Sequence, residues 1–241
     1  MRKILTLFSW PNVRTAWTNK FKSSALYWRY RHLFDSKVWN RYALDGSAPR
    51  RKFYAEVVLA NKAASIFEFG CASGANLLSL ERHLPVSYRF SFFGYDISSA
   101  AIRLAQKNQY SNLVKFDTAL TTGDVELFLK NTQSAQFDLA IFDRVLYLLP
   151  GQVVLDHFLK FSRYYKNIVI DDFLCTDAME KYDGKNYTAR NYPALLEDLG
   201  FSILSVEATE HTTGQDIFLN AHAKRMCFKK TEKISADLES N

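Results

Sequence analysis

Short apolar segments that end at a glycine or an aspartate alternate along this chain with segments of helical periodicity. Residues 65–69 end at Gly70, residues 88–95 end at Asp96, and residues 137–142 end at Asp143. Leucines and alanines spaced three and four apart mark helices between these segments. Strands that alternate with helices form parallel sheets through right-handed crossovers. We therefore predict an α/β fold, with a doubly wound, mostly parallel sheet covered by helices on both faces.

The same pattern predicts the individual elements. Strands are expected over residues 65–69, 88–95, 113–120, 137–142, 167–170, 201–206 and 225–228. Helices are expected over residues 51–60, 77–84, 99–105, 124–129, 155–162 and 193–199. Three boundary signals support them: Ser98 as an N-cap, Pro85 as a stop, and Gly200 as a left-handed C-terminal residue. The inner face of helix 155–162 is expected to carry Leu155, Phe158 and Leu159.

Length and composition fit one sizeable domain with an extension. The chain has 241 residues, of which 48% are hydrophobic and 23% charged, which excludes disorder over most of its length. We expect a helical N-terminal extension over residues 1–48, one domain over residues 49–230, and a polar tail over residues 231–241. No apolar run reaches the length needed to span a bilayer. Cys71, Cys175 and Cys227 form no close pair, so a reducing cytoplasm is expected rather than a disulfide framework.

The N-terminal arm is basic and aromatic. Residues 1–40 hold eight basic residues, one acidic residue and all four tryptophans, whereas the remaining residues are nearly neutral. A signal peptide is disfavoured because Pro11 and Arg14 interrupt the apolar run early. Two interpretations stay open: a helical extension that packs its aromatic side chains on the body, and peripheral contact with an anionic membrane surface.

The turn after the first strand is built from small residues. Residues 70–74 (GCASG) lie between a strand and a helix, where glycine lets the backbone approach a ligand and the helix start offers free N–H groups. Asp96 ends the second strand, where a carboxylate can accept both hydroxyls of a ribose. A dinucleotide site requires the spacing G-x-G-x-x-G, but Ala72 and Ala75 occupy two of its glycine positions. A nicotinamide oxidoreductase is therefore disfavoured.

Six segments in order resemble the class I S-adenosylmethionine-dependent methyltransferases. They are IFEFGCASGANL, FFGYDIS, TTGDVELFL, FDLAIFDRVLYLLP, NIVIDDF and LLEDLGF, and they span about residues 64–206. The resemblance implies a seven-stranded, Rossmann-like sheet and S-adenosyl-L-methionine as the cofactor. Ala72 departs from the family's commonest glycine, although alanine is also small.

The resemblance also implies where the cofactor lies. The residues expected to face its methionine part are Glu68, Gly70, Cys71, Ala72, Ser73 and Gly74. Asp96 is expected to hold the ribose hydroxyls, with Ile97 beside the adenine. Asp124 and Val125 are expected at the adenine, with Asp117 on the preceding strand as the rival position.

Asp143 and Arg144, after the fourth strand, are expected between cofactor and acceptor. An oxygen acceptor usually needs a base, and the candidates are Asp143 and His211. Asp143 has a plainer interpretation as a cofactor-side or helix-capping carboxylate, and His211 has one as a histidine of a surface loop. Asp171 and Asp172 lie at the next strand end, and carboxylates there resemble the Mg²⁺ site of metal-dependent O-methyltransferases. Mg²⁺ is possible but not favoured, because strand-end aspartates often cap a turn.

The acceptor is predicted only by class. The chain lacks the Asn/Asp-Pro-Pro-Tyr/Phe run with which base-methylating enzymes grip a flipped base, so sequence-specific nucleic-acid recognition is not expected. Residues 173–193 hold Tyr182, Tyr187, Arg190 and Tyr192, an aromatic and polar connection suited to covering a small polar acceptor or a glycan. O-Methylation of a small-molecule, glycan or lipid-linked acceptor is the favoured function. The alternative is a non-catalytic protein that keeps the fold to bind cofactor or partners.

Overall fold

Seven strands of the described residues form one twisted sheet. The computed structural model describes residues 25–34, 36–45, 49–85, 87–109, 111, 114–182, 187–209 and 221–231. The strand order is β3-β2-β1-β4-β5-β9-β8. The strands are β1 (Ser65–Phe69), β2 (Ser91–Tyr95), β3 (Val114–Asp117), β4 (Phe137–Asp143), β5 (Tyr165–Phe173), β8 (Phe201–Ala208) and β9 (Ala223–Lys230). The first five pair in parallel and β9 runs antiparallel between β5 and β8, so the predicted mostly parallel sheet is confirmed.

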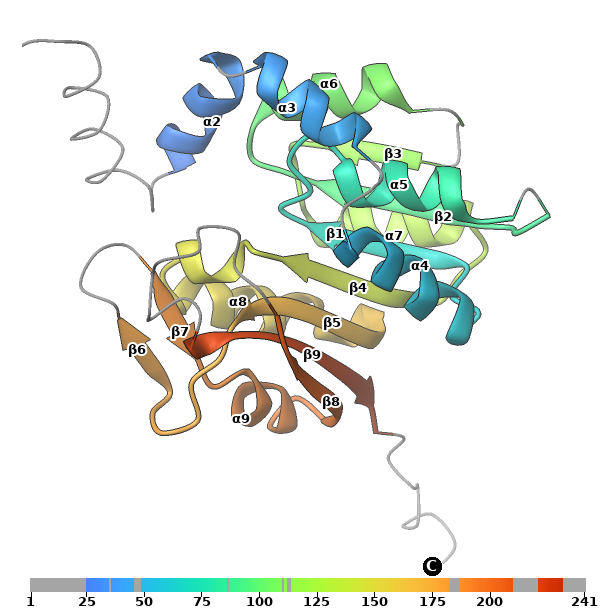
Figure 1. Ribbon diagram of the computed structural model, residues 1–241. Helices are drawn as coiled ribbons and strands as arrows, with labels where there is room; N and C mark the ends of the chain where they lie inside the picture. The colour runs from blue at the N-terminus through green and yellow to red at the C-terminus, as the bar shows by residue number, and fades with distance from the viewer. Residues whose placement is uncertain are drawn as a thin grey trace, which may run out of the picture.

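Helices cover both faces of this sheet. One face carries α4 (Pro49–Ala60), α5 (Ala75–His83) and α6 (Ser99–Asn108), whose apolar side chains pack with Ile66, Phe92 and Ile141. The other carries α7 (Thr122–Asn131), α8 (Gly151–Phe161) and α9 (Tyr192–Glu197), which pack with Phe67 and Phe142. In Figure 1, α8 and α9 lie on the opposite side of the sheet from α5 and α6. The strands are buried on both faces, which explains their nearly continuous apolar sequences.

A pair of helices and a hairpin lie near the carboxyl ends of the parallel strands. Helices α2 (Ala25–Phe34) and α3 (Ser36–Leu44) pack against α5 and α6, and Arg82 of α5 donates hydrogen bonds to the carbonyls of Ala43 and Leu44. The hairpin of β6 (Glu180–Tyr182) and β7 (Thr188–Arg190) lies at the same side of the molecule as α2 (Figure 1). The carboxyl ends of the strands, where ligands bind in such sheets, therefore lie between the α2–α3 pair and the hairpin.

Most predicted elements are confirmed, with three corrections. The second strand begins at Ser91 rather than at residue 88. Leu159 does not face inward, because the buried stripe of α8 is Val154, His157, Phe158 and Phe161, and Leu159 is 60% exposed. The β6–β7 hairpin lies within a segment expected only as a loop. Its strands are three residues each, too short for a period-two pattern to stand out.

The structure bears on the expectations for the cysteines and membrane spans, but the tail and most of the basic arm are not described. Cys71, Cys175 and Cys227 are all free thiols. No helix within the described ranges is long and apolar enough to cross a membrane. The polar tail beyond Thr231 and most of the basic arm, residues 1–24, lie outside the described residues. The membrane and packing interpretations of that part of the arm therefore stay predictions.

Candidate active site

The turn between β1 and α5 has an unusual backbone. Gly70, Ala72 and Gly74 have φ angles of 72°, 48° and 78°, all in the left-handed region. The N–H groups of Gly70 and Cys71 both donate to the carbonyl of Tyr95, at 2.7 and 2.9 Å. These two hydrogen bonds to one carbonyl tie the turn to the end of β2. The backbone is thereby curled into a small open loop at the edge of the sheet, the position of a ligand in this class of fold.

The side chains of this turn point away from its open face. Cys71 is buried, and its thiol faces the core beneath α5 and α6, where burial raises the pKa of the thiol. Ser73 is fully buried and donates to the carbonyl of Trp39 at 2.9 Å, which joins the turn to α3. A side chain at Gly70 would overlap Val145. The turn therefore presents backbone rather than side chains to a ligand.

Three polar side chains are joined behind the turn. The Nδ2 group of Asn76, on α5, donates to Oε1 of Glu68 at 2.7 Å and to Oδ2 of Asp143 at 2.8 Å. Asn76 thus links the ends of β1 and β4, a contact that sequence reasoning missed. Oε2 of Glu68 and Oδ1 of Asn76 are buried and have no hydrogen-bond partner among the described residues. These two atoms are acceptors available to a cationic ligand group.

Burial controls the protonation of these carboxyl groups. Burial, and then the charge of Asp143, raises the pKa of Glu68 to about 8. Burial also raises the pKa of Asp143, although Arg50 opposes the shift with a guanidinium 3.5 Å away. A carboxyl whose pKa lies closer to neutrality accepts a proton more readily than an ordinary one. Burial thus makes both carboxyl groups easier to protonate than an ordinary one, while the role of Asp143 as a base stays a prediction.

Asp96 holds the ends of two loops together. Its Oδ2 accepts from the N–H of Ala72 at 2.9 Å, and its Oδ1 accepts from the N–H of Ser98 at 2.8 Å. The carboxyl group is buried, which raises its pKa to about 6 against the effect of these two hydrogen bonds. Each oxygen keeps a second lone pair. Ile97 follows, and its carbonyl accepts from Arg29 of α2 at 3.3 Å.

The two residues expected at the adenine lie on α7. Asp124 forms a capping box with Thr121, whose N–H and hydroxyl both donate to Oδ2 of Asp124. Val125 is 1% exposed and packs in the core among Phe93 and Phe128. The structure does not bring these two side chains to the turn. Asp117, the rival position, lies at the end of β3, in register with Tyr95 at the end of β2.

Arg144 points away from the turn. It has a left-handed φ of 53°, and its Nε donates to Asp171 at 2.8 Å. Its Nη2 donates to Thr209, and its guanidinium lies over the ring of Phe173. Arg225 contacts the other oxygen of Asp171 at 3.0 Å. The arginine therefore faces β5 and the acceptor side rather than the loop expected to hold the cofactor.

The paired aspartates of β5 are engaged by the protein. Asp171 lies between the two guanidinium groups, and Asp172 accepts from the N–H groups of Leu146, Tyr147 and Phe173. Burial raises the pKa of Asp172 to about 7. No group of three histidine, cysteine, aspartate or glutamate side chains suited to a metal occurs among the described residues. The carboxylates expected as Mg²⁺ ligands thus serve as anchors for an arginine pair and for a turn.

An aromatic group lies next to Arg144. The rings of Tyr147, Phe173 and Tyr187 contact one another, with centroids 4.9 to 6.2 Å apart. Arg190 is buried and Tyr192 is fully buried, so neither faces an acceptor. The side chain of Tyr182 and all of His211 lie outside the described residues. Of the predicted cover, Tyr187 lies beside Tyr147, and its role toward an acceptor stays a prediction.

The start of α4 and the helix before it bring together residues that sequence reasoning did not consider. Arg50 and Arg51 begin α4, and both guanidinium groups lie over the ring of Tyr42 from α3. Tyr54 is fully buried, and its hydroxyl has no hydrogen-bond partner among the described residues. The basic surplus seen in the sequence covers residues 1–40 and includes neither arginine.

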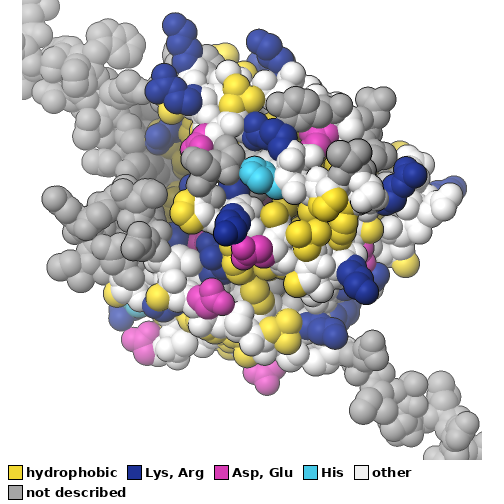
Figure 2. Space-filling view, turned by 45° about the vertical axis from the view of Figure 1, so that its right-hand side comes forward, with side chains coloured by type: hydrophobic (Ala, Val, Ile, Leu, Met, Phe, Trp, Pro, Cys, Tyr) yellow, Lys and Arg dark blue, Asp and Glu magenta, His cyan; other side chains and the backbone are white. Residues whose placement is uncertain are grey.

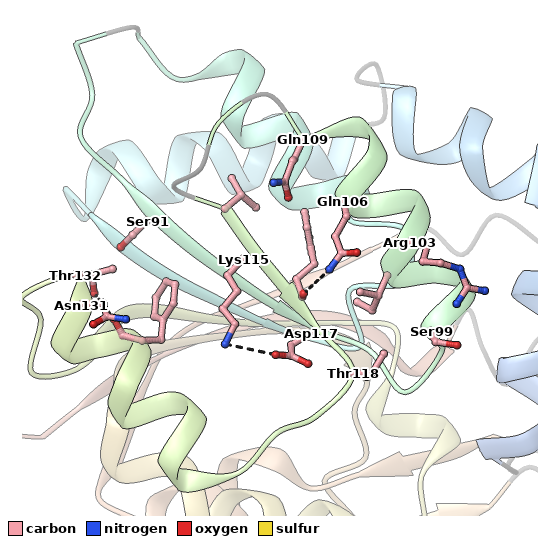
Figure 3. Close-up of a pocket in the computed structure, with 14 residues that line it drawn as sticks. Ser91, Ser99, Arg103, Gln106, Gln109, Lys115, Asp117, Thr118, Asn131 and Thr132 are labelled. Carbon is pink, nitrogen blue, oxygen red and sulfur yellow. Dashed lines mark hydrogen bonds and ion pairs between the residues drawn. The ribbon is translucent and has the colours of Figure 1, made fainter.

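An open groove lies elsewhere on the molecule. It has a volume of about 930 Å³ and follows the outer edge of β3, between α6 and the end of α7. Figure 3 shows Arg103 and Gln106 on one side and Asn131 and Thr132 on the other. Lys115 and Asp117 pair with each other at 3.4 Å along its floor. The groove follows an exposed strand edge, and Ser99, Asp117 and Thr118 bring one end of it near the carboxyl ends of β2 and β3.

Comparison with known families identifies the class of domain. A family model described as a methyltransferase domain matches residues 60–216, well over half of the chain. No curated protein matches the sequence.

Solved structures share the fold. Magnesium protoporphyrin IX methyltransferase from Synechocystis PCC 6803, solved with bound SAM, is 15% identical at a TM-score of 0.58, over 88% of this chain and 98% of that one. An O-methyltransferase family protein from Burkholderia thailandensis is 11% identical at a TM-score of 0.58, over 84% of this chain and 62% of that one. At these identities the likeness is one of fold.

Proposed function

The chain belongs to the methyltransferase domain family of S-adenosylmethionine-dependent enzymes, and we propose that it methylates an oxygen of a small polar acceptor. The observation that carries this proposal is the buried link from Glu68 through Asn76 to Asp143. It joins the turn that fits the cofactor to the strand end that would meet the acceptor.

The residues present fit the cofactor. The left-handed backbone at Gly70, Ala72 and Gly74 curls the turn at the carboxyl end of β1, where ligands bind in this class of fold. The unpartnered oxygens of Glu68 and Asn76 suit an ammonium group. The free lone pairs of Asp96 suit two ribose hydroxyls. At the adenine we propose Ile97, with Asp117 replacing Asp124, since the carboxylate of Asp124 caps its own helix.

Each residue has a limited task in the reaction. S-Adenosylmethionine supplies an activated methyl group, so the protein must mainly align the acceptor and exclude water. Tyr147 and Tyr187 provide an aromatic wall for the acceptor, and Arg144 lies beside it. Asp143 takes the proton of the acceptor hydroxyl, because burial raises its pKa and it lies at the end of β4. His211 remains a second candidate base.

The acceptor class rests on the site and on the neighbours. Aromatic side chains beside a charged group suit a sugar or another small polar molecule. The two similar structures are described as a porphyrin methyltransferase and an O-methyltransferase family protein. On the face seen in Figure 2, lysine and arginine side chains are scattered among acidic and apolar ones, unlike the continuous basic surface of a nucleic-acid binder.

Calorimetry with S-adenosylhomocysteine tests the cofactor site first. We expect micromolar binding to the wild type and affinity at least about tenfold lower for Asp96→Asn, since the ribose hydroxyls lose a charged acceptor. Asn retains an oxygen for one backbone bond, whereas Ala would remove both anchors of the loop. Well-folded wild-type protein that does not bind would refute the proposal.

Mass spectrometry of reactions with phenols, sugars and hydroxylated lipids then tests catalysis. Asp143→Asn should abolish methylation of the acceptor that the wild type prefers. Turnover that is unaffected by EDTA would exclude a required Mg²⁺ ion, while cofactor binding without turnover on any acceptor would favour the non-catalytic alternative.

A further inference from the structure

Arg51 is a buried cation without an anion. The residue is 1% exposed, and its Nη2 donates to the carbonyl of Tyr42 at 2.6 Å. Its Nε and Nη1 are buried and have no hydrogen-bond partner in the part of the chain that the structure describes. Arg51 forms no ion pair with any carboxylate of the described residues. An uncompensated buried guanidinium is costly, and a ligand that brings an anion would offset that cost.

Tyr42 and Asp143 connect Arg51 to the polar group behind the β1–α5 turn. The guanidinium of Arg51 lies 4.8 Å from the centroid of the Tyr42 ring, and its charge opposes the upward pKa shift of Glu68. Asp143, which Arg50 contacts at 3.5 Å, accepts from Asn76. Arg50 lies over the same tyrosine ring, and its side chain is 27% exposed. Two cations of α4 thus lie close to Glu68 and Asn76, whose unpartnered oxygens are acceptors.

This arrangement is complementary to an amino acid. An α-amino acid carries an ammonium group and a carboxylate on one carbon, so it needs acceptors and cationic donors side by side. We infer that Arg51 of α4 binds the α-carboxylate of the cofactor's amino-acid part, with Arg50 as a supporting cation, while Glu68 and Asn76 take the ammonium group. The inference rests on the proposed function and adds its carboxylate-binding residue.

The consequence concerns the organisation of the chain. The family model matches residues 60–216, whereas Arg50 and Arg51 precede that region. The start of α4 is therefore a working part of the cofactor site. Helix α3, from the N-terminal extension, is also joined to the turn through the hydrogen bond that Ser73 donates to the carbonyl of Trp39.

A plainer role for Arg51 is to hold α3 against α4 through the carbonyl of Tyr42. Three ligands separate the two roles: S-adenosylhomocysteine, its decarboxylated analogue, and 5′-methylthioadenosine, which lacks the whole amino-acid part. Substituting a carboxylate-binding residue weakens the binding of S-adenosylhomocysteine alone, whereas substituting a structural residue weakens the binding of all three ligands alike.

Calorimetry on the full chain should use wild type, Arg51→Gln, Arg51→Lys and Arg50→Gln. We expect Arg51→Gln to lower the affinity for S-adenosylhomocysteine at least about tenfold. The affinities for the other two ligands should stay within about twofold of the wild-type values. Arg51→Lys keeps the charge and should recover part of the affinity. Arg50→Gln should act in the same sense with a smaller effect. Arg82→Gln is the matched control, because it loosens α3 without facing the turn.

The outcomes are distinct. Equal weakening of all three ligands by Arg51→Gln, or no weakening of S-adenosylhomocysteine, would overturn the inference. If Arg51→Gln does not fold, the wild type decides: decarboxylated S-adenosylhomocysteine that binds as tightly as the parent compound would overturn it. Wild-type protein that binds no S-adenosylhomocysteine would instead refute the proposed function itself.

Discussion

Several carboxyl groups at the strand ends are buried, and burial shifts their pKa values upward. The pKa of Glu68 is raised to about 8, that of Asp172 to about 7 and that of Asp96 to about 6. Glu68 is mostly protonated at neutral pH until a cation arrives beside it. Binding an ammonium group would lower that pKa again and release a proton.

The raised pKa of Glu68 predicts a pH dependence of stability. Between the unfolded pKa near 4.5 and the folded pKa of about 8, the folded state holds a proton that the unfolded state has lost. The free energy of unfolding therefore falls as the pH rises through this window, by up to about 1.4 kcal/mol per pH unit for this group. Urea titrations of ligand-free protein from pH 5 to 8 should show the decline.

Glu68→Gln should make that decline shallower, because glutamine cannot ionise and still accepts the bond from Asn76. Glu56→Gln is the control, since Glu56 is exposed on α4. Identical pH profiles for wild type and Glu68→Gln would contradict the assignment of the buried proton to Glu68.

At the level of elements, the β1–α5 turn depends on glycine at position 70. Gly70 combines a φ of 72° with backbone so close to Val145 that a β-carbon would overlap that side chain. We expect Gly70→Ala to lower the free energy of unfolding by about 1–3 kcal/mol. Adding Val145→Ala should give back part of the loss, with a coupling of about 0.5–3 kcal/mol in a double-mutant cycle.

Gly123→Ala is the matched glycine control. A β-carbon there meets only the hydroxyl of Thr121 at 3.7 Å, and the residue lies within α7. This substitution should be neutral or stabilising, by up to about 1 kcal/mol. Additive effects of the Gly70 and Val145 substitutions would show that no close contact exists.

The β6–β7 hairpin depends on one buried arginine. Arg190 donates to Glu180 at 2.6 Å, to the carbonyl of Leu146 at 2.6 Å and to the carbonyl of Leu149 at 2.5 Å. Arg190→Met should destabilise the protein by about 1.5–3 kcal/mol, because two carbonyls lose a charged donor. Hydrogen exchange should accelerate in β7 and in the short helix η1 (Leu146–Leu148).

Glu180→Gln should have a smaller effect, since Glu180 is 47% exposed and the carbonyl bonds of Arg190 remain. Unchanged exchange rates in Arg190→Met would indicate that the hairpin is held by other contacts, such as the bridge between Leu174 and Arg190.

At the scale of the whole molecule, cofactor binding should stabilise the fold, because the site exists only when β1, β4 and the extension are assembled. S-Adenosylhomocysteine at about 100 times its Kd should add about 2.7 kcal/mol. For a chain of this length the melting temperature should rise by roughly 5–11 °C. NAD at the same concentration is the control and should cause no shift; a shift with NAD alone would revive the oxidoreductase interpretation.

The order of strands and helices was predictable because it depends on local signals. Apolar segments that close on Gly70, Asp96 and Asp143 marked the parallel strands, and Ser98 was correctly predicted as a cap. Errors arose where the local signal was weak, as at Leu159 or in the three-residue strands of the hairpin. Asp124 has the sequence context expected of an adenine residue, but Thr121 and Asp124 also have the spacing of a capping box, and the structure shows that box formed.

The sequence by itself determined the doubly wound fold, the glycine turn and the carboxylate at the end of β2, since periodicity, turn chemistry and strand-end position are properties of neighbouring residues. The packed structure alone shows that Asn76 joins Glu68 to Asp143, and that Arg51 of α4 is buried and pairs with no carboxylate of the described residues. The physical reason is that these contacts depend on how helices pack on the sheet. Packing brings together side chains far apart in the chain, and no local pattern encodes that distance.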